Sequence, residues 1–255
     1  MKRVVLKVGS AVLTQEHDIA HQRMQNLVDF IVELREKYEV ILVTSGAVAA
    51  GYTQIQLDRK IVANRQALAA IGQPILMNFY AEKLNKYNIK LGQVLVTSAN
   101  FSTYIQYKHI VDNIEALLSV NILPIINEND STATQELIFG DNDQLSAEVT
   151  CYLEADILII LSDIDAYYDA DPRKESSAKP FKVVNNISRE ELEKSVSPNS
   201  EFATGGIVTK LYAADLILQH DKSMFLADGF DLSDVKSYML DGVHKNGTLF
   251  TKANS

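Results

Sequence analysis

The sequence predicts an α/β fold, a three-layer α/β/α sandwich built around an open and mainly parallel sheet. Short runs of β-branched and other apolar residues alternate with longer segments of helical periodicity along nearly the whole chain. The short runs are apolar at almost every position, which is typical of strands that are buried on both faces of a sheet. Parallel neighbours need crossover connections, so the helical segments are expected to cover both faces.

The individual elements follow from the same two patterns, consecutive apolar residues for strands and apolar residues every three or four positions for helices. Strands are predicted near residues 4–6, 40–43, 94–96, 122–126, 157–161 and 224–226, with a turn and a last strand over 245–250. Helices are predicted near residues 20–37, 61–87, 107–119, 142–154 and 206–220, and the charged run 189–194 reads as a solvated helix face. The polar stretch 169–179 is predicted to be a loop.

The composition is that of a globular protein and argues against several classes. The 255 residues are 47% apolar and 22% charged, and their net charge is −9. An acidic chain lacks the basic surface that binding to nucleic acid or to anionic membranes requires. The single cysteine, Cys151, rules out an internal disulfide and is expected in the core. No apolar run reaches the roughly 18 residues of a membrane span. We expect one domain over residues 1–255, in the cytoplasm.

Polar residues follow three of the predicted strands. Ser45-Gly46 follows the second strand, residues 127–130 follow the fourth, and Ser162-Asp163 follows the fifth. In open α/β sheets, ligands bind at the edge where the carboxyl ends of the strands meet. The acidic and amide side chains of residues 127–130 could read the ammonium and carboxylate groups of an amino acid, or they could form an exposed turn.

Two further segments at this edge could receive an anion. Lys7-Val8-Gly9-Ser10 ends the first strand, and its glycine permits either close approach of the backbone or a positive φ. The small, hydroxyl-rich segment 44–51 leads into a helix whose free N–H groups could hold an anion, although its spacing matches neither a P-loop nor a dinucleotide fingerprint. The alternatives are a solvated lysine beside a turn and a capped helix that packs on the sheet.

The most informative segments are Gly140-Asp141-Asn142-Asp143 and Thr204-Gly205-Gly206 with Lys210. The carboxylates of the first segment could hold Mg²⁺ or orient a lysine, or the segment could be a turn with an N-cap. The second segment combines a helix N-terminus with a lysine one turn further on, which suits a triphosphate; the alternative is a flexible loop before a helix. Together they predict phosphoryl transfer to a small polar substrate.

In this order, these segments resemble the amino acid kinase family nearly from end to end. The matching segments are Leu6–Ser10, Val43–Ala47, Ile126–Asp130, Gly140–Asp143, Ala170–Arg173, Thr204–Gly206 and Thr209-Lys210. The segments 127–130 and 140–143 are most similar to the branch of the family that acts on glutamate. The resemblance implies the amino acid kinase fold, with glutamate bound mainly by the N-terminal part and ATP mainly by the C-terminal part. It also implies that ATP phosphorylates the γ-carboxylate of L-glutamate to L-glutamyl 5-phosphate, the first step of proline biosynthesis.

The resemblance assigns roles to individual residues. Lys7 and Lys210 would hold the transferring phosphate, and Asp143 would orient both lysines. The residues that bind glutamate would be Ser45, Gly46, Asn127, Asp130 and Asn142. The residues that bind ATP would be Lys7, Ser162, Asp163, Thr204, Gly205, Gly206, Ile207, Val208, Thr209 and Lys210. Mg²⁺ would accompany ATP without an assigned protein ligand, proline would be a feedback inhibitor, and the protein would be a homo-oligomer.

The sequence also departs from the family pattern. Many relatives carry an RNA-binding-like PUA domain after the kinase domain, and we expect this chain to lack one. Ser162 stands where relatives often have threonine, which keeps the hydroxyl group, and residues 163–167 lack the more usual glycine. The alternatives to glutamate phosphorylation are another kinase of the family, acting on acetylglutamate or aspartate, and a non-catalytic amino-acid sensor. A sensor would not need both Lys7 and Lys210, and a nucleic-acid-binding protein is disfavoured by the net charge.

Overall fold

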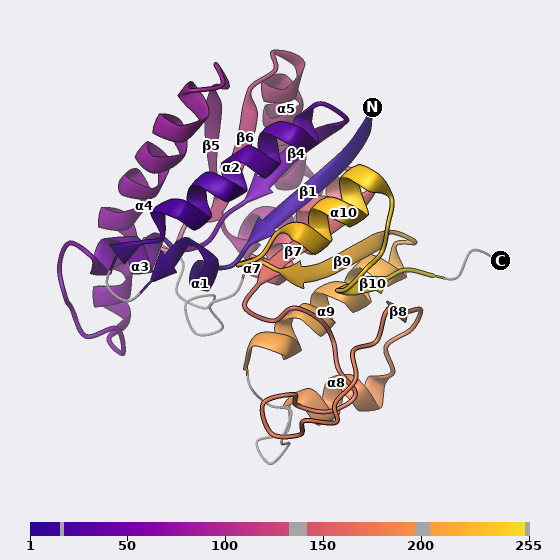
Figure 1. Cartoon of the computed structure of the whole chain (residues 1–255). Coiled ribbons are helices and arrows are strands. Elements are labelled where there is room, and N and C mark those ends of the chain that lie inside the picture. Colours follow the sequence, from indigo (N-terminus) through magenta and orange to yellow (C-terminus); the bar gives the residue numbers. More distant parts are fainter. Residues whose placement is uncertain (16–17, 133–141, 197–204, 253–255) are drawn as a thin grey trace.

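The computed structural model describes residues 1–15, 18–132, 142–196 and 205–252, which fold around one large sheet (Figure 1). The sheet has eight strands in the order β5-β6-β4-β1-β7-β9-β10-β8. These strands are β1 (Lys2–Val8), β4 (Tyr38–Val43), β5 (Leu91–Val96), β6 (Leu123–Glu128), β7 (Ile157–Ser162), β8 (Val183–Val184), β9 (Ser223–Asp228) and β10 (Thr248–Phe250). From β5 across to β9 all neighbours are parallel, and only β10 runs antiparallel to β9. The prediction of a mainly parallel sheet is confirmed.

The central strand β1 sets the register of the sheet edge. Lys7 lies opposite Val43 of β4 on one side and Ile160 of β7 on the other. The three strands therefore end nearly level. The segments that follow β4 and β7 begin beside the end of β1, which brings polar residues from separate parts of the chain to one edge of the sheet.

Helices cover both faces of the sheet, as predicted for a three-layer sandwich. One face carries α1 (Ser10–Leu13), α2 (His21–Arg35), α3 (Ala47–Tyr52), α4 (Val62–Asn85) and α10 (Ser233–Asp241). In Figure 1, α2 lies over β4, and α10 packs beside α2 on the side of the sheet that carries β9. The other face carries α5 (Tyr104–Ser119), α7 (Asn142–Tyr152), α8 (Arg189–Val196) and α9 (Gly205–Gln219). Alternate residues of β1 divide between the two layers, since Leu6 packs in the first hydrophobic cluster and Val5 in the second.

The predicted elements are present, with ends shifted by a few residues, and the loop over 169–179 is confirmed between bridge partners Tyr168 and Pro180. The helix expected from segment 44–51 is α3, and the patterns missed mainly short elements: α1, α10, β8, the 3₁₀ turn η1 (Ser98–Phe101) and the hairpin of β2 (Thr14–Gln15) with β3 (Asp18–Ile19). Elements this short span too few residues to show a period. No helix in the described ranges has the length and apolar content that crossing a membrane would need.

Helices α3 and α4 pack backbone against backbone through two glycines. A Cβ added to Gly51 would lie 1.9 Å from the carbonyl oxygen of Leu68, and one added to Gly72 would lie 1.8 Å from that of Ala47. Real side chains cannot occupy such positions, so both residues must be glycine for the helices to cross this closely. This crossing fixes the N-terminus of α3 at the sheet edge.

Candidate active site

A buried carboxylate joins two lysines at the carboxyl edge of the sheet. Asp143 lies in the first turn of α7, Lys7 near the end of β1 and Lys210 in α9, and their exposed fractions are 0%, 2% and 3%. The Lys7 ammonium pairs with Asp143 Oδ1. The Lys210 ammonium lies 3.0 Å from Asp143 Oδ2 and donates to the carbonyl oxygen of Gly206 at the same distance. The Thr209 hydroxyl also donates to Asp143 Oδ2, at 2.9 Å.

The surroundings of this cluster favour a negatively charged ligand. Helix α7 begins one residue before Asp143 and helix α9 begins five residues before Lys210, so their positive dipole ends lie at the cluster. Helix N-termini and lysines together are the usual protein environment of bound phosphate groups. The arrangement is therefore suited to holding a phosphoryl group that carries several negative charges.

Gly9 and Gly46 lie at this edge of the sheet, and each is glycine for a different reason. Gly9 has φ −73°, which any residue can adopt, and an added Cβ would lie 3.4 Å from the nearest protein atom and 4.0 Å from Lys7 Nζ. A positive φ is therefore not the reason for glycine at this position, and the missing side chain leaves space beside the lysine. Gly46 caps α3 with φ +97°, a left-handed conformation that favours glycine.

A cavity of about 210 Å³, here called the α3 cavity, opens beside the N-terminus of α3. It carries charges of both signs, with Glu128 and Asp130 as acidic residues and Arg59 and Arg65 as basic ones. Its remaining lining residues are Ser10, Ser45, Gly46, Ala47, Val48, Ala49 and Asn142. A cavity with both carboxylates and guanidinium groups is suited to a small zwitterion such as an amino acid.

Four of the five residues predicted to bind glutamate line the α3 cavity: Ser45, Gly46, Asp130 and Asn142. The fifth, Asn127, is 1% exposed and lies behind Asn142, whose Nδ2 donates to Asn127 Oδ1 at 2.7 Å. The same nitrogen also donates to the carbonyl oxygen of Thr44 at 2.6 Å. The nitrogen of the Asn142 carboxamide thus makes hydrogen bonds that fix its orientation. Asn142 directly precedes Asp143 in the sequence.

Sequence patterns missed the two arginines of the α3 cavity. The Arg59 guanidinium stacks over the Tyr52 ring, 4.3 Å from its centre, and Arg65 is half-buried in the first turn of α4. Within the described part of the chain, neither guanidinium forms an ion pair with a carboxylate. Both lie in or just after the connection between α3 and α4, where isolated basic residues carry no motif. Only the close crossing of these helices brings them to the cavity.

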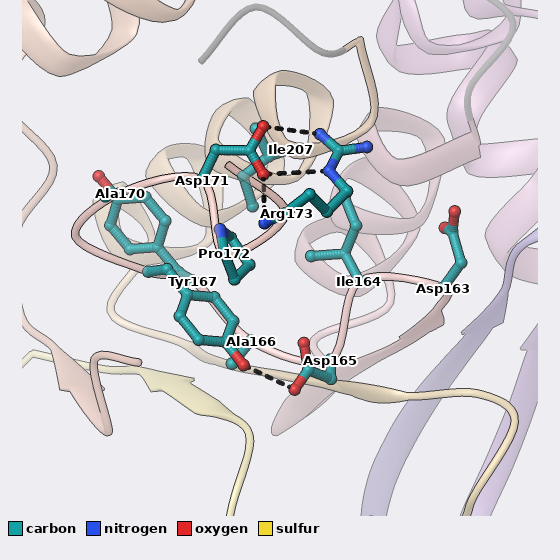
Figure 2. A pocket seen from close by; sticks show the side chains of 11 residues that line it. Asp163, Ile164, Asp165, Ala166, Tyr167, Ala170, Asp171, Pro172, Arg173 and Ile207 are labelled. Atoms are coloured by element: carbon teal, nitrogen blue, oxygen red, sulfur yellow. Dashed lines mark hydrogen bonds and ion pairs between the residues drawn. The ribbon is translucent and has the colours of Figure 1, made fainter. Parts of the chain in front are cut away.

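A second cavity of about 270 Å³, here called the α9 cavity, lies between the chain that follows β7 and the start of α9 (Figure 2). Ile164, Pro172 and Ile207 give it an apolar lining, and Asp163, Asp165 and Arg173 give it polar groups. Its other lining residues are Ala166, Tyr167, Tyr168, Ala170 and Asp171. An apolar slot with a few polar groups on its rim is suited to a flat heterocycle such as a nucleotide base.

Hydrogen bonds and ion pairs hold the rim of the α9 cavity in place. Asp171 accepts two hydrogen bonds from the Arg173 guanidinium, at 3.0 and 3.1 Å, and these bonds lower the pKa of the Asp171 carboxyl group (Figure 2). The Tyr168 hydroxyl donates to Asp165 at 2.8 Å. Burial and then this bond raise the pKa of Tyr168 to about 12. Tyr168 is therefore a neutral donor at physiological pH.

The residues predicted to bind ATP are distributed around this cavity and the charged cluster. Asp163 and Ile207 line the cavity, whereas Ser162 is 3% exposed beneath it and donates to Asp163 Oδ1 at 2.9 Å. Gly205, Gly206, Val208 and Thr209 form the first turns of α9, below Lys210. Thr204, together with Gly140 and Asp141 of the motif before α7, lies outside the described residues.

Side chains that could bind a metal ion were compared over the described residues. Nowhere in ranges 1–15, 18–132, 142–196 and 205–252 do three or more His, Cys, Asp or Glu side chains come together in a group that could hold one. Mg²⁺ is commonly bound by one or two carboxylates plus substrate phosphates and water. The exposed Asp163 carboxylate, at the rim of the α9 cavity, is a residue of the kind that fits this mode.

Comparisons with known proteins agree with this geometry. The model of the amino acid kinase family matches residues 2–228. The chain is 53% identical to the glutamate 5-kinase of Wolinella succinogenes over 99% of this chain and 98% of that protein. It is 47% identical to the glutamate 5-kinase of Leishmania donovani over 98% of this chain and 95% of that protein.

Among solved structures, the carbamate kinase of Giardia lamblia bound to AMP-PNP superposes with a TM-score of 0.66. The superposition covers 98% of both chains at 18% sequence identity, so this likeness concerns the fold alone. The family model and the two similar kinases show more than the fold, because these matches extend over almost the whole sequence. The chain belongs to the amino acid kinase family.

Proposed function

We propose that this protein phosphorylates the γ-carboxylate of L-glutamate with ATP and releases L-glutamyl 5-phosphate and ADP. The proposal rests chiefly on Asp143, which holds lysines from β1 and α9 together at the sheet edge. Full-length relatives named glutamate 5-kinase support the choice of glutamate over other acids in the family. The product places the enzyme at the first step of proline biosynthesis.

The charged cluster lies next to both cavities, which suggests how the substrates meet. Asn142, the neighbour of Asp143, lines the α3 cavity. Ile207, three residues before Lys210, lines the α9 cavity. Glutamate in the α3 cavity and the nucleotide in the α9 cavity would thus direct the acceptor carboxylate and the triphosphate toward the same lysines.

The chemistry requires positioning and charge stabilisation but no general base. A γ-carboxylate has an ordinary pKa of about 4.3 and is ionised at neutral pH. One of its oxygens attacks the γ-phosphorus of ATP, and the bond from that phosphorus to the β–γ bridging oxygen breaks, with ADP taking the electron pair. Lys7 and Lys210 would stabilise the negative charge on the transferring group, and Asp143 would hold the two ammonium groups in place. Mg²⁺ bound with ATP would neutralise further charge on the phosphates.

The polar groups of the α3 cavity would bind the α-ammonium and α-carboxylate groups of glutamate. The α-ammonium would face Asp130 and the carboxamide oxygen of Asn142. The α-carboxylate would face the side of the cavity that carries Arg59 and Arg65, with Ser45 and the N-terminus of α3 at Gly46 as further donors. Asn127 would act through Asn142, because it does not line the cavity.

The nucleotide would be bound by residues on the other side of the cluster. Asp163 and Ile207 would contact the base or ribose in the α9 cavity, and Ser162 would hold Asp163 in place. The N-terminal turns of α9, from Gly205 to Thr209, together with Thr204 would face the phosphates. Inhibition by proline, a homo-oligomeric state and a cytoplasmic location are further proposals that rest on the family resemblance.

A coupled assay of ADP release tests the proposed function. The purified protein is given ATP and Mg²⁺ with L-glutamate, N-acetyl-L-glutamate or L-aspartate in turn, and the acyl phosphate is trapped as a hydroxamate. We expect ADP release and hydroxamate only with L-glutamate. Activity with one of the other acids instead would assign another member of the family, and binding of glutamate without turnover would identify a sensor.

A further inference from the structure

A line of four carboxamides runs from the α3 cavity to the outer strand of the sheet. Asn142 Nδ2 donates to Asn127 Oδ1 at 2.7 Å, and Asn127 Nδ2 donates to Gln73 Oε1 of α4 at 2.8 Å. Gln73 Nε2 then donates to Gln93 Oε1 of β5 at 2.9 Å. The three inner members are buried, and Gln93 at the outer end is exposed.

Two backbone groups fix the direction of this line. The N–H of Glu128 can only donate, and it lies 2.9 Å from one polar atom of the Asn127 carboxamide, which must therefore be the oxygen. The carbonyl of Thr44 can only accept, and it lies 2.6 Å from one polar atom of Asn142, which must be the nitrogen. These two anchors give the same direction independently. Reversing any inner amide would place acceptor against acceptor or donor against donor.

The direction of the line determines which atom Asn142 presents to the substrate. Its nitrogen is occupied by Thr44, Asn127 and, at 3.3 Å, the Ser45 hydroxyl. The oxygen is the remaining polar atom of a side chain that lines the α3 cavity. Asn142 lines the same cavity as Asp130 and Glu128, whose ionised carboxylates also offer only acceptors.

We propose that Gln73 is a positioning residue that enforces recognition of an amino group in the substrate. Gln73 accepts from the Asn127 nitrogen and so acts together with the Glu128 N–H and the Thr44 carbonyl: the three contacts keep the Asn127 oxygen turned toward Asn142 and the Asn142 oxygen turned away from Asn127. An acceptor in the α3 cavity binds an α-ammonium and gives no hydrogen bond to a substrate that lacks one. The inference rests on the proposed function, because it assumes that the α3 cavity holds the amino acid. It assigns Gln73 a role in substrate selection although Gln73 does not line that cavity.

The experiment compares L-glutamate with glutarate, the same dicarboxylate without the amino group. Gln73→Met removes the acceptor at nearly constant side-chain volume. Gln73→Glu keeps an acceptor for Asn127, and the exposed Gln93 amide can turn to donate to it. Gln25→Met is the matched control, because Gln25 also donates through Nε2, to Asp29 at 2.7 Å, but lies on α2 away from both cavities.

We expect Gln73→Met to raise KM for L-glutamate by about tenfold, the effect of one hydrogen bond, and to change kcat by less than about twofold. The preference for glutamate over glutarate in kcat/KM should fall by a similar factor, and KM for ATP should not change. Gln73→Glu should restore most of the preference, and Gln25→Met should behave as the wild type.

Each departure from these results would count against the inference. A folded Gln73→Met protein that keeps the wild-type preference would overturn it, and so would a Gln73→Glu protein as unselective as the methionine variant. If Gln73→Met does not fold, Gln73→Leu replaces it, because leucine also lacks the acceptor that Asn127 uses and fills much of the same space. The same loss of preference is expected there. A wild-type protein that does not phosphorylate glutamate would instead overturn the proposed function itself.

Discussion

Replacing Asp143 with asparagine tests the central feature of the site. The substitution keeps the size and shape of the side chain but removes the negative charge that pairs with Lys7 and Lys210. The amide nitrogen of asparagine would also face one of the two ammonium groups, donor against donor. We therefore expect Asp143→Asn to lower both the stability of the protein and its rate of phosphoryl transfer.

The size of both effects follows from the geometry. The Lys210–Asp143 contact of 3.0 Å corresponds to about 5 kcal/mol of Coulomb attraction at an effective dielectric constant of about 20. The carboxylate also repays part of the desolvation of two buried ammonium groups, so removing it should lower the free energy of unfolding by about 3–5 kcal/mol. In a protein of this size that is a fall in Tm on the order of 10 °C. Misplaced ammonium groups should lower kcat by about 10²–10³.

Chemical denaturation, thermal unfolding and the coupled ADP assay measure these quantities. Asp112→Asn makes the same chemical change in the exposed Lys108–Asp112 pair on α5, and it should alter stability by about 0.5 kcal/mol or less and kcat not at all. If Asp143→Asn is as stable and as active as the Asp112→Asn control, the two lysines do not depend on this carboxylate, and the proposed organisation of the site is wrong.

Three further predictions concern the surroundings of the site. Gly72→Ala should destabilise the protein by more than about 2 kcal/mol in urea unfolding, because its Cβ would lie 1.8 Å from the carbonyl oxygen of Ala47; an unchanged midpoint would show that α3 and α4 can separate. Arg59→Gln should raise KM for glutamate about tenfold and leave KM for ATP unchanged, because it removes a cation from the α3 cavity only; equal effects on both substrates would contradict this role. Burial raises the pKa of Cys151 from its ordinary 9.0 to about 11, so its alkylation by iodoacetamide at pH 8 should be about 100-fold slower than that of an exposed thiol, and a comparable rate would show that the thiol is not desolvated.

Much of the fold follows directly from the sequence. Runs such as 157–161 are apolar at every position, because both faces of the central strands are covered, and long helices such as α4 show enough turns to define a period. The segments after β4 and β7 were predicted to meet because parallel strands end at one edge. The last strand, β10, was predicted within 245–250, but its antiparallel pairing with β9 and the two-residue β8 had no signal, since they depend on distant partners.

The sequence by itself determined which side chains stand at the ends of the strands and which helix starts lack bulky residues, because these are properties of neighbours along the chain. The tertiary structure decided the contact of Lys7 and Lys210 with Asp143, which the family resemblance had implied, since it depends on how α7 packs on β1 and α9 on α7. Arg59 and Gln73 likewise gain their positions from the crossing of α3 and α4. Such contacts join residues far apart in sequence, and the physical reason they escape a linear reading is that packing, not local pattern, brings them within bonding distance.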